Sequence, residues 1–341
     1  MADKRDFDEL LEKFRRHREV MKEELHKVII GQDAVIDQML AAIFTGGHCL
    51  LVGVPGLAKT LIVSTIAQIL DVRFKRIQFT PDLMPSDITG TNVLDETDTG
   101  RREFRFVHGP VFTNVLLADE INRTPPKTQA ALLQAMQEYQ VTIAGQTFDL
   151  EQPFLVLGTQ NPIEQEGTYP LPEAQIDRFT FKVQVEGVDS ATLAEIITTR
   201  QHGQAPELDV VCTAEELNEL FALVDRVHLP RAVAGYISRL VGATHPGQET
   251  SPEEVRQFVR YGASPRAAIA LASTSRAAAL LAGKPNVGFE DVRRVVGSVL
   301  GHRLILDYSA RLEGWTTARM VELLVEAVPE MAQELPEDLS S

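Results

Sequence analysis

The pattern of apolar and polar residues changes twice along the chain. Over residues 1–27 apolar side chains recur at roughly helical spacing, at Phe7, Leu10, Leu11, Phe14, Met21 and Leu25. This spacing predicts an amphipathic helix that packs one face against another part of the protein. From about residue 45 short apolar runs replace the helical pattern, and after about residue 203 only helical segments follow.

Five short runs in the middle region predict the strands of a parallel sheet. Three are continuously apolar, as expected of strands buried on both faces, and cover residues 48–52, 115–118 and 154–157. The other two, residues 74–80 and 179–185, alternate more strictly and predict half-exposed strands. Helical patterns separate the runs, which favours an α/β fold with a parallel sheet between helices.

Two insertions interrupt this α/β pattern. The first is the polar stretch 81–102, which is rich in proline and glycine. The second covers residues 140–153, where the sequence alternates on both sides of Ala144-Gly145-Gln146. Alternation on both sides of a glycine turn predicts a β-hairpin.

The region after residue 203 predicts a separate, all-helical domain. It contains an Ala-rich run at 267–281, followed by a Gly/Pro break at residues 283–285. The expected domains are an N-terminal amphipathic helix over 1–27, an α/β core over 28–203, a helical domain over 204–328 and an acidic tail over 329–341.

The charge balance narrows the classes of partner. The 341 residues include 33 Lys and Arg against 48 Asp and Glu, a formal net charge of −15. Such a field repels phosphate backbones and anionic lipid, which argues against nucleic acid or a membrane surface as the main partner. The N-terminus lacks the apolar core of a secretory signal, and no later run is long enough to span a membrane. We therefore expect a cytoplasmic protein without direct membrane insertion.

The sequence GVPGLAKT at residues 53–60 is typical of a phosphate-binding loop, the Walker A motif. It follows an apolar run and precedes the helical pattern LIVSTIAQIL, as such a loop requires. Its backbone amides and the helix N-terminus present positive charge to phosphates, Lys59 reaches the β and γ phosphates, and the Thr60 hydroxyl ligates magnesium. The candidate nucleotide-binding residues are Gly53, Val54, Pro55, Gly56, Leu57, Ala58, Lys59 and Thr60. The strict pattern has glycine at position 58, and a methyl group there is tolerated where the residue has a negative φ.

An apolar run at 115–118 ends in Asp119 and Glu120, the pattern of a Walker B strand. Magnesium that bridges nucleotide phosphates takes few protein oxygens, so Asp119 holds the ion through its water shell. Glu120 is then free to orient and deprotonate the attacking water. A third apolar run ends in Gly-Thr-Gln-Asn161-Pro. Because the carboxyl ends of parallel strands meet at one edge of the sheet, Asn161 is placed either to polarise that water or to read the γ-phosphate.

Together these motifs resemble the MoxR family of AAA-plus ATPases. The resemblance covers nearly the whole chain and rests on GVPGLAKT, on DEINR from Asp119, on GTQNP, on LPEAQIDRF at 171–179 and on ASPRA at 263–267. It implies a ring, usually a hexamer, that binds ATP and Mg²⁺ between subunits. It also implies that residues 81–102 are a helix-2 insertion, that 140–153 are the hairpin before the sensor 1 strand, and that the helical domain is a lid.

The resemblance also implies roles for single residues. Asn161 matches sensor 1, Arg178 matches the arginine finger presented to a neighbouring subunit, and Arg266 matches sensor 2 in the lid. Ile30 and Gly31 match the segment that contacts adenine. The alternatives from the residues alone are a surface Asp-Arg pair at Arg178 and an ordinary helix-opening charge at Arg266.

For function, the resemblance implies Mg²⁺-dependent ATP hydrolysis coupled to chaperone-like remodelling, assembly or metal-cofactor insertion of client proteins. Family members commonly act with a partner that has a von Willebrand factor A domain. A metal-chelatase motor subunit and a nucleic-acid-dependent motor are the alternative functions. A non-catalytic nucleotide-gated scaffold is a third, against which the intact Lys59, Asp119 and Glu120 argue. No aromatic-hydrophobic-glycine pore segment is present, and Leu83-Met84 is the nearest apolar pair in the first insertion.

Overall fold

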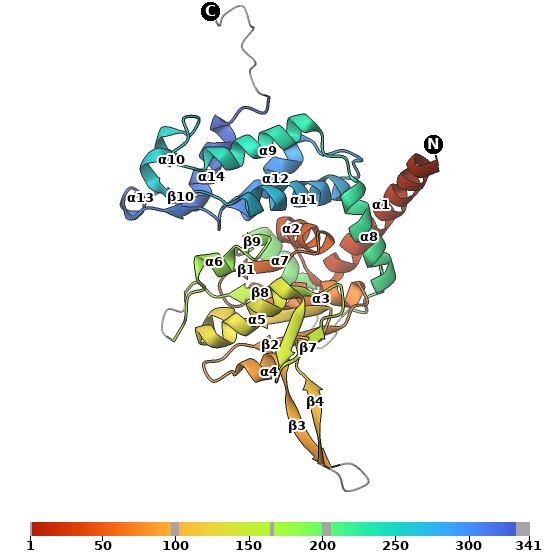
Figure 1. Cartoon of the computed structure of the whole chain (residues 1–341). Helices are drawn as coiled ribbons and strands as arrows, with labels where there is room; N and C mark the ends of the chain where they lie inside the picture. Colours follow the sequence, from red (N-terminus) through yellow and green to blue (C-terminus); the bar gives the residue numbers. More distant parts are fainter. Residues whose placement is uncertain (1, 97–101, 164–166, 200–205, 332–341) are drawn as a thin grey trace, which may run out of the picture. The chain divides into compact units, whose positions relative to one another are not determined.

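The computed structural model describes residues 2–96, 102–163, 167–199 and 206–331 (Figure 1). The chain forms two compact units. We call Lys13–Phe221 the core unit, and Met1–Glu12 together with Ala222–Ser341 the helical unit. Two helices, α1 (Ala2–Val28) and α8 (Ala214–Arg226), contribute residues to both units.

Five parallel strands form the central sheet of the core unit, in the order β2-β5-β8-β1-β9. Their bounds are β1 Cys49–Val52, β2 Phe74–Gln78, β5 Val115–Asp119, β8 Leu155–Gln160 and β9 Phe181–Gln184. The three continuously apolar runs are the inner strands, and the two alternating runs are the edge strands. Edge strands face solvent on more sides, which explains why they carry more polar residues. The predicted α/β sheet is thus confirmed.

Helices cover both faces of this sheet. Leu50, Leu116 and Val156 of the inner strands share one buried cluster with Leu132 and Met136 of α5. On each of these strands, the residues next to the named one point to the opposite face of the sheet, because successive side chains of a strand alternate between its two faces. Helix α2 contacts β9, and α3 contacts β2 and β5. The helices of the core unit are α2 Asp33–Phe44, α3 Lys59–Ile69, α4 Pro85–Thr89, the 3₁₀ turn Ile121–Arg123, α5 Pro126–Glu138, α6 Glu173–Ile176 and α7 Ser190–Thr199.

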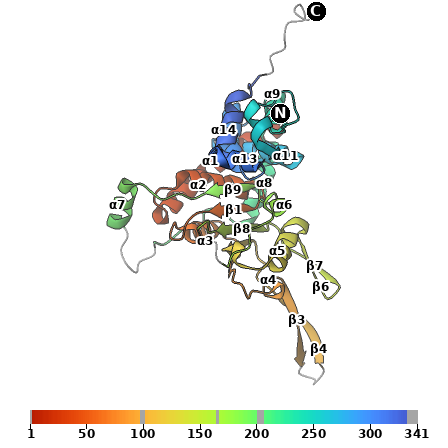
Figure 2. The same cartoon turned by 90° about the vertical axis from the view of Figure 1, so that its left-hand side faces the viewer.

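Both insertions contain hairpins (Figure 2). The predicted hairpin at 140–153 forms strands β6 (Gln140–Ile143) and β7 (Gln146–Asp149). Its turn residues Ala144 and Gly145 have φ values of 49° and 81°, as a two-residue hairpin turn requires. The polar insertion holds α4 and β3 (Gly90–Glu96), and β3 pairs in a second hairpin with β4 (Arg102–His108), which extends beyond the predicted end of the insertion at residue 102. The sequence pattern did not predict this hairpin.

The helical unit is built mainly from helices, as expected of the lid. They are α9 Arg231–Ala243, α10 Glu253–Phe258, α11 Pro265–Leu281, α12 Phe289–Leu300, α13 Tyr308–Leu312 and α14 Thr317–Ala327. It also contains a short antiparallel pair, β10 (Val259–Tyr261) with β11 (Ile305–Leu306). Strands of three and two residues are too short to produce a readable alternation, so the expectation of a purely helical domain missed them.

Among the described residues, no helix is both long enough and apolar enough to cross a membrane.

Candidate functional site

The ends of three inner strands bring the predicted motifs to one edge of the sheet. The phosphate loop follows β1, Asp119 is the last residue of β5, and Asn161 follows β8. Strand β8 pairs with both neighbours in parallel, with Gln160 opposite Val52 and Gly158 opposite Ala118. This register places the loop, the two carboxylates and Asn161 side by side at the carboxyl ends of the strands.

The loop backbone has the shape of an anion cradle. A methyl group on Gly53 would lie 2.5 Å from the Val185 carbonyl oxygen, so no side chain fits there. Gly56 has a φ of +86°, a conformation that glycine adopts without strain. Ala58 also lies in the left-handed region, with φ 56° and ψ 16°, so the negative φ at which a methyl group would be tolerated is not present. An alanine methyl in this region costs about 1–2 kcal/mol, which explains why glycine is the usual residue at this place in the loop.

Lys59 opens α3 and points back over the loop. Its Nζ donates to the carbonyl oxygens of Gly53 and Val54, the latter at 2.8 Å. Partial burial lowers the pKa of Lys59, while the nearby carboxylates of Asp119 and Glu120 oppose that shift. A cation held among backbone carbonyls at the mouth of a glycine loop fits the phosphates of a nucleotide.

Asp119 lies at the centre of a hydrogen-bond network and is only 8% exposed. Thr159 Oγ1 donates to Asp119 Oδ1 at 2.5 Å, and Thr60 Oγ1 donates to Asp119 Oδ2 at 3.4 Å. A hydroxyl and a carboxylate this close, beside a phosphate cradle, are the oxygen ligands that Mg²⁺ prefers. The residues present therefore fit a magnesium ion. The described residues contain no group of three or more His, Cys, Asp and Glu side chains placed to hold a metal ion, and magnesium bound to nucleotide phosphates needs fewer protein ligands.

Glu120 has a φ of 55° and a ψ of 49°, an uncommon backbone conformation for a residue with a side chain. Its amide donates to Thr159 Oγ1 at 2.8 Å. Its Oε2 accepts hydrogen bonds from Gln78 Nε2 at 2.8 Å and from Arg123 Nη1 at 2.9 Å. The carboxylate is therefore fixed from two sides, at the same edge as Lys59 and Thr60.

Four residues of this network were missed by sequence reasoning: Arg76, Gln78, Arg123 and Thr159. Arg76 and Gln78 lie on β2, next to β5 in the sheet, where Gln78 is opposite Asp119. Polar residues at alternate positions of β2 were a visible signal, but their partners are about 40 positions away in sequence. Thr159 and Arg123 lie within quoted motifs, and only the three-dimensional structure shows their bonds.

Asn161 is 5% exposed and lies directly after β8. Its Oδ1 accepts a hydrogen bond from the Ile163 amide at 3.1 Å, as in a local turn. The turn that follows from the Asn-Pro sequence is thus present. It orients the side-chain amide without occupying its N–H donors in that bond, so a role as sensor remains compatible with the geometry.

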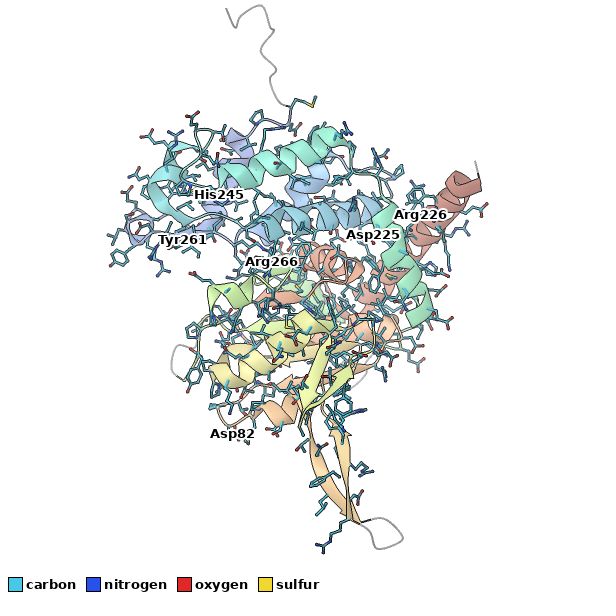
Figure 3. The ribbon with its side chains drawn as sticks, viewed as in Figure 1. Asp82, Asp225, Arg226, His245, Tyr261 and Arg266 are labelled. Atoms are coloured by element: carbon cyan, nitrogen blue, oxygen red, sulfur yellow. The ribbon has the colours of Figure 1, made fainter. Side chains whose placement is uncertain are left out.

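Arg178 lies between α6 and β9, an edge strand of the sheet. Its Nη1 donates to the Leu133 carbonyl of α5 in the same subunit. One such bond leaves most donors of the guanidinium for other partners. Arg266 lies in the first turn of α11 in the helical unit, where it is exposed (Figure 3).

The expected adenine-contacting segment, Ile30 and Gly31, lies between α1 and α2. Gly31 has a φ of +74°, and a methyl group there would lie 2.9 Å from Thr192 Cγ2 of α7. Gln32 Nε2 donates to the Glu186 carbonyl oxygen at 2.7 Å. The segment is thus packed against the chain between β9 and α7, which adds Thr192 to the residues near the candidate adenine site.

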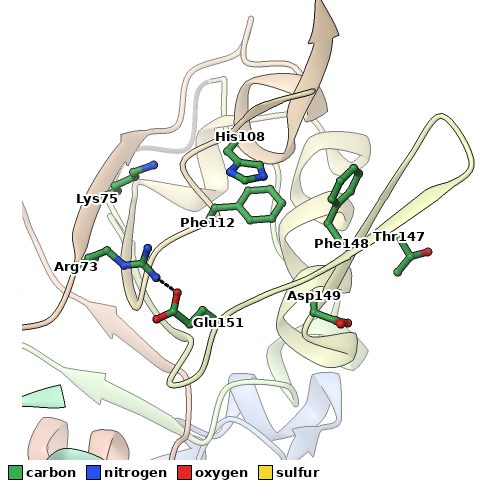
Figure 4. Close-up of a pocket in the computed structure, with 8 residues that line it drawn as sticks. All are labelled: Arg73, Lys75, His108, Phe112, Thr147, Phe148, Asp149 and Glu151. Carbon is green, nitrogen blue, oxygen red and sulfur yellow. Dashed lines mark hydrogen bonds and ion pairs between the residues drawn. The ribbon is translucent and has the colours of Figure 1, made fainter. Parts of the chain in front are cut away.

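A pocket of about 600 Å³ lies away from these motifs, at the base of the two hairpins (Figure 4). It is lined by Arg73, Lys75, His108, Phe112, Thr147, Phe148, Asp149 and Glu151. Rings of both hairpins stack here: the centroids of Phe106 and Phe148 are 4.3 Å apart, and those of His108 and Phe112 are 4.2 Å apart. The pocket wall therefore joins the two insertions.

Beyond this pocket, one face of the β3–β4 hairpin carries exposed apolar side chains. Leu94 pairs with Phe104 and Asn92 with Phe106, and paired residues of an antiparallel ladder share a face. Phe106 packs in the aromatic cluster, whereas Phe104 is 75% exposed and Leu94 is 51% exposed. We call Leu94 and Phe104 the hairpin pair. These residues were missed when Leu83-Met84 was taken as the nearest apolar pair of the insertion.

Comparisons with known proteins agree with this geometry. Residues 48–181 match the ATPase family associated with various cellular activities, and residues 252–324 match the AAA lid domain. Chaperone MoxR1 of Mycobacterium tuberculosis is 41% identical over 92% of this chain and 84% of its own length. Protein MoxR of Methylorubrum extorquens is 30% identical over 83% of this chain and 86% of its own length.

A solved structure supports the same assignment over nearly the full length. A crystal structure of a protein assigned as an ATPase from Cytophaga hutchinsonii matches with a TM-score of 0.90 and 40% identity. The match covers 98% of this chain and 100% of that one. With the phosphate loop, the paired carboxylates and the helical lid in place, the chain belongs to the MoxR family of AAA-plus ATPases, and ATP hydrolysis is its reaction.

Proposed function

We propose that this ATPase hydrolyses ATP with Mg²⁺ at the subunit interfaces of a ring, usually of six copies, and couples hydrolysis to remodelling a client protein. The observation that carries the proposal is the meeting of Lys59, Thr60, Asp119 and Glu120 at one sheet edge. Their arrangement supports the proposal, because a cation lies over the glycine loop, a hydroxyl and a carboxylate lie together, and a second carboxylate lies beside them.

The positions of the core residues support a role for each. The loop amides and Lys59 would bind the β and γ phosphates, and Thr60 and Asp119 would hold the magnesium ion. When bound, magnesium offsets the negative charge that develops on the transferring phosphoryl group. Glu120 accepts the proton of the attacking water, and Asn161 orients that water or the γ-phosphate. Ile30 and Gly31 contact the adenine.

Two arginines are proposed to complete the site, and the one that acts on a neighbouring subunit, Arg178, is the reason for proposing a ring. Arg178 precedes an edge strand and would act on the nucleotide of the adjacent subunit. Arg266, in the lid, would act on the nucleotide bound by its own core. We take the functional division to be the core over 28–203 and the lid over 204–328, which move relative to one another during the cycle. An isolated subunit would then bind ATP and hydrolyse it slowly.

The client is proposed to be a protein, since apolar side chains without a covering contact are suited to protein surfaces. The hairpin pair provides such a surface on the helix-2 insertion. Two relatives are named MoxR and one of them is named a chaperone. Assembly or metal-cofactor insertion of an enzyme is the form of remodelling proposed, with a von Willebrand factor A domain protein as the adaptor.

The experiment holds the ring in its ATP state and identifies the client. A Glu120→Gln variant binds ATP without turnover, so a client bound in that state remains through a wash with ATP and is released by a wash with ADP. The client is then purified and mixed with the unsubstituted ring. The proposal predicts that ATP changes the protease sensitivity of the client when the unsubstituted ring is present, and does not change it when the Glu120→Gln ring is present. An unchanged client, or ATPase activity stimulated by DNA in place of protein, would contradict it.

A further inference from the structure

Arg76 makes the shortest contact to Oδ2 of Asp119, the carboxylate proposed to hold magnesium. Its Nη2 lies 2.6 Å and its Nε 3.2 Å from Asp119 Oδ2. The other oxygen of Asp119 accepts the Thr159 hydroxyl. Arg76 therefore shares Oδ2 with the Thr60 hydroxyl, on the side of Asp119 that faces the phosphate loop.

This contact adds a guanidinium to a carboxylate that is largely buried and otherwise bonded only to two hydroxyls in the described residues. The Asp119 side chain is 11% exposed, whereas that of Arg76 is 50% exposed. A buried carboxylate needs a cation or several donors nearby. Arg76 places a guanidinium directly on Oδ2, and its half-exposed side chain has solvent into which it can withdraw.

The same arginine also contacts the residue that holds the candidate base. Arg76 Nη2 lies 3.2 Å from Gln78 Oε1, and Gln78 Nε2 donates to Glu120 Oε2. Strand β2 thus positions both carboxylates through two neighbouring side chains on one face. Withdrawal of Arg76 would remove two hydrogen bonds from Asp119 Oδ2 and one from Gln78 Oε1 together.

We propose that Arg76 is a resident counter-cation of the magnesium site, which holds Asp119 Oδ2 until magnesium arrives and must leave that oxygen before the ion, with its water shell, is held there. This inference rests on the proposed role of Asp119 as a magnesium ligand. Two cations cannot occupy one side of a single carboxylate oxygen without strong repulsion. Arg76 therefore raises the magnesium concentration at which the site fills, and it is a positioning residue with no contact to the reacting atoms.

The test measures magnesium dependence without turnover. A fluorescent ATP analogue is titrated into the full-length protein across a series of free magnesium concentrations, for the unsubstituted chain, Arg76→Gln, Arg76→Lys and Arg73→Gln. Arg73 is the matched control, because it directly precedes the same strand, is exposed and pairs with Glu151. All four proteins are first checked for their thermal unfolding midpoint with and without magnesium and nucleotide.

The expected result is a half-saturating magnesium concentration about fivefold lower for Arg76→Gln, the upper range for a half-exposed ion pair. The affinity for the ATP analogue measured in chelator should be the same in all four proteins. The half-saturating magnesium concentration of Arg76→Lys should lie between those of Arg76→Gln and the unsubstituted chain, and that of Arg73→Gln should match the unsubstituted chain. A half-saturating concentration that is unchanged or higher in Arg76→Gln would overturn the inference while leaving the proposed function intact. If the unsubstituted chain binds no nucleotide with or without magnesium, both fail.

Discussion

Two surfaces of the core unit differ sharply in how their side chains are held. At the carboxyl ends of the inner strands, Asp119, Thr159 and Asn161 are at most 8% exposed, and each hydrogen-bonds within the subunit. On the β3–β4 hairpin, Phe104 and Leu94 of the hairpin pair are 75% and 51% exposed. The side chains at the sheet edge are therefore held in place by contacts within their own subunit, whereas the side chains on the hairpin are suited to contact with another molecule.

Substitutions on these two surfaces are therefore expected to impair different properties of the protein. Groups fixed by buried hydrogen bonds act on a reaction only when their geometry is held. Exposed apolar groups contribute little to the stability of the free subunit, since they are not removed from water. Substitutions at the sheet edge should therefore affect turnover, and substitutions on the hairpin should affect the coupling of turnover to work.

The largest effect on turnover is expected at Arg178, and it tests whether the active site at the sheet edge needs a residue from a neighbouring subunit. Arg178→Ala should lower turnover by about 10³–10⁵-fold, the range for an arginine finger, while nucleotide affinity changes little. The decisive measurement mixes Arg178→Ala with Glu120→Gln, two inactive variants. Some interfaces of the mixed ring would join an intact Glu120 to an intact Arg178, so activity should return. A mixture that stays inactive after confirmed subunit exchange would show that Arg178 does not act in trans.

The next effect separates binding from chemistry at the same edge. Lys59→Ala should lose nucleotide binding, because the positive charge over the phosphate loop is gone. Glu120→Gln should bind ATP with near-normal affinity and turn over about 10²–10⁴-fold more slowly, since the amide cannot accept a proton. Equilibrium binding and steady-state turnover, measured on both variants, check the two roles. Parent-rate hydrolysis by Glu120→Gln would remove Glu120 from its role.

A smaller effect is expected at the opposite end of the sheet, where His48 stabilises the fold and has no proposed role in chemistry. His48 Nδ1 accepts from the Val156 amide at 3.0 Å, so Nε2 carries the proton and donates to the Met136 carbonyl oxygen at 3.1 Å. Burial lowers the pKa of His48 from 6.5 to about 4. Between these values the unfolded chain binds more protons than the folded one, so stability falls as pH falls.

The size of this effect follows from linkage at about 1.4 kcal/mol per pH unit, or about 3 kcal/mol between pH 6.5 and 4. Denaturant unfolding at several pH values measures it. His48→Gln should be less stable at pH 7 and should lose less stability on acidification. An equal pH slope in both proteins would show that His48 does not carry the dependence.

The smallest effect concerns the left-handed alanine of the phosphate loop. Ala58→Gly removes a methyl group from a strained backbone position, at the expense of a more flexible unfolded chain. The expected net change is a gain of up to about 1 kcal/mol in stability, with nucleotide affinity retained. Thermal unfolding and nucleotide titration of Ala58→Gly beside Ala58→Val provide the comparison, and a glycine variant less stable than the valine variant would contradict the prediction.

The parts of the structure that the sequence predicted are those with local patterns. A glycine loop between an apolar run and a helix can be recognised from a stretch of about 20 residues. Asp119 and Glu120 at the end of a strand can be recognised from a similarly short stretch. The turn at Ala144 and Gly145 was readable for the same reason. In each case the neighbours in sequence are also the neighbours that fix the conformation.

The parts that were missed depend on contacts between residues far apart in sequence, or on a backbone conformation that the pattern of apolar and polar residues does not determine. Arg76 and Gln78 meet their carboxylates only because β2 pairs with β5 in one particular register. The sign of φ at Ala58 is set by the whole loop. The β3–β4 hairpin was hidden among polar residues, although Phe104 and Phe106 alternate as strand residues do.

The most direct test of the contrast uses a purified client and measures ATP turnover and client conversion in the same reaction. The variants are Glu120→Gln at the sheet edge and Phe104→Ser on the hairpin, with Val93→Ser, exposed on the other face of the same hairpin, as the matched control. The account predicts that Glu120→Gln keeps the client bound without hydrolysis, and that Phe104→Ser hydrolyses ATP at the parent rate without converting the client. Client conversion at the parent rate by Phe104→Ser, or loss of hydrolysis in that variant, would contradict it.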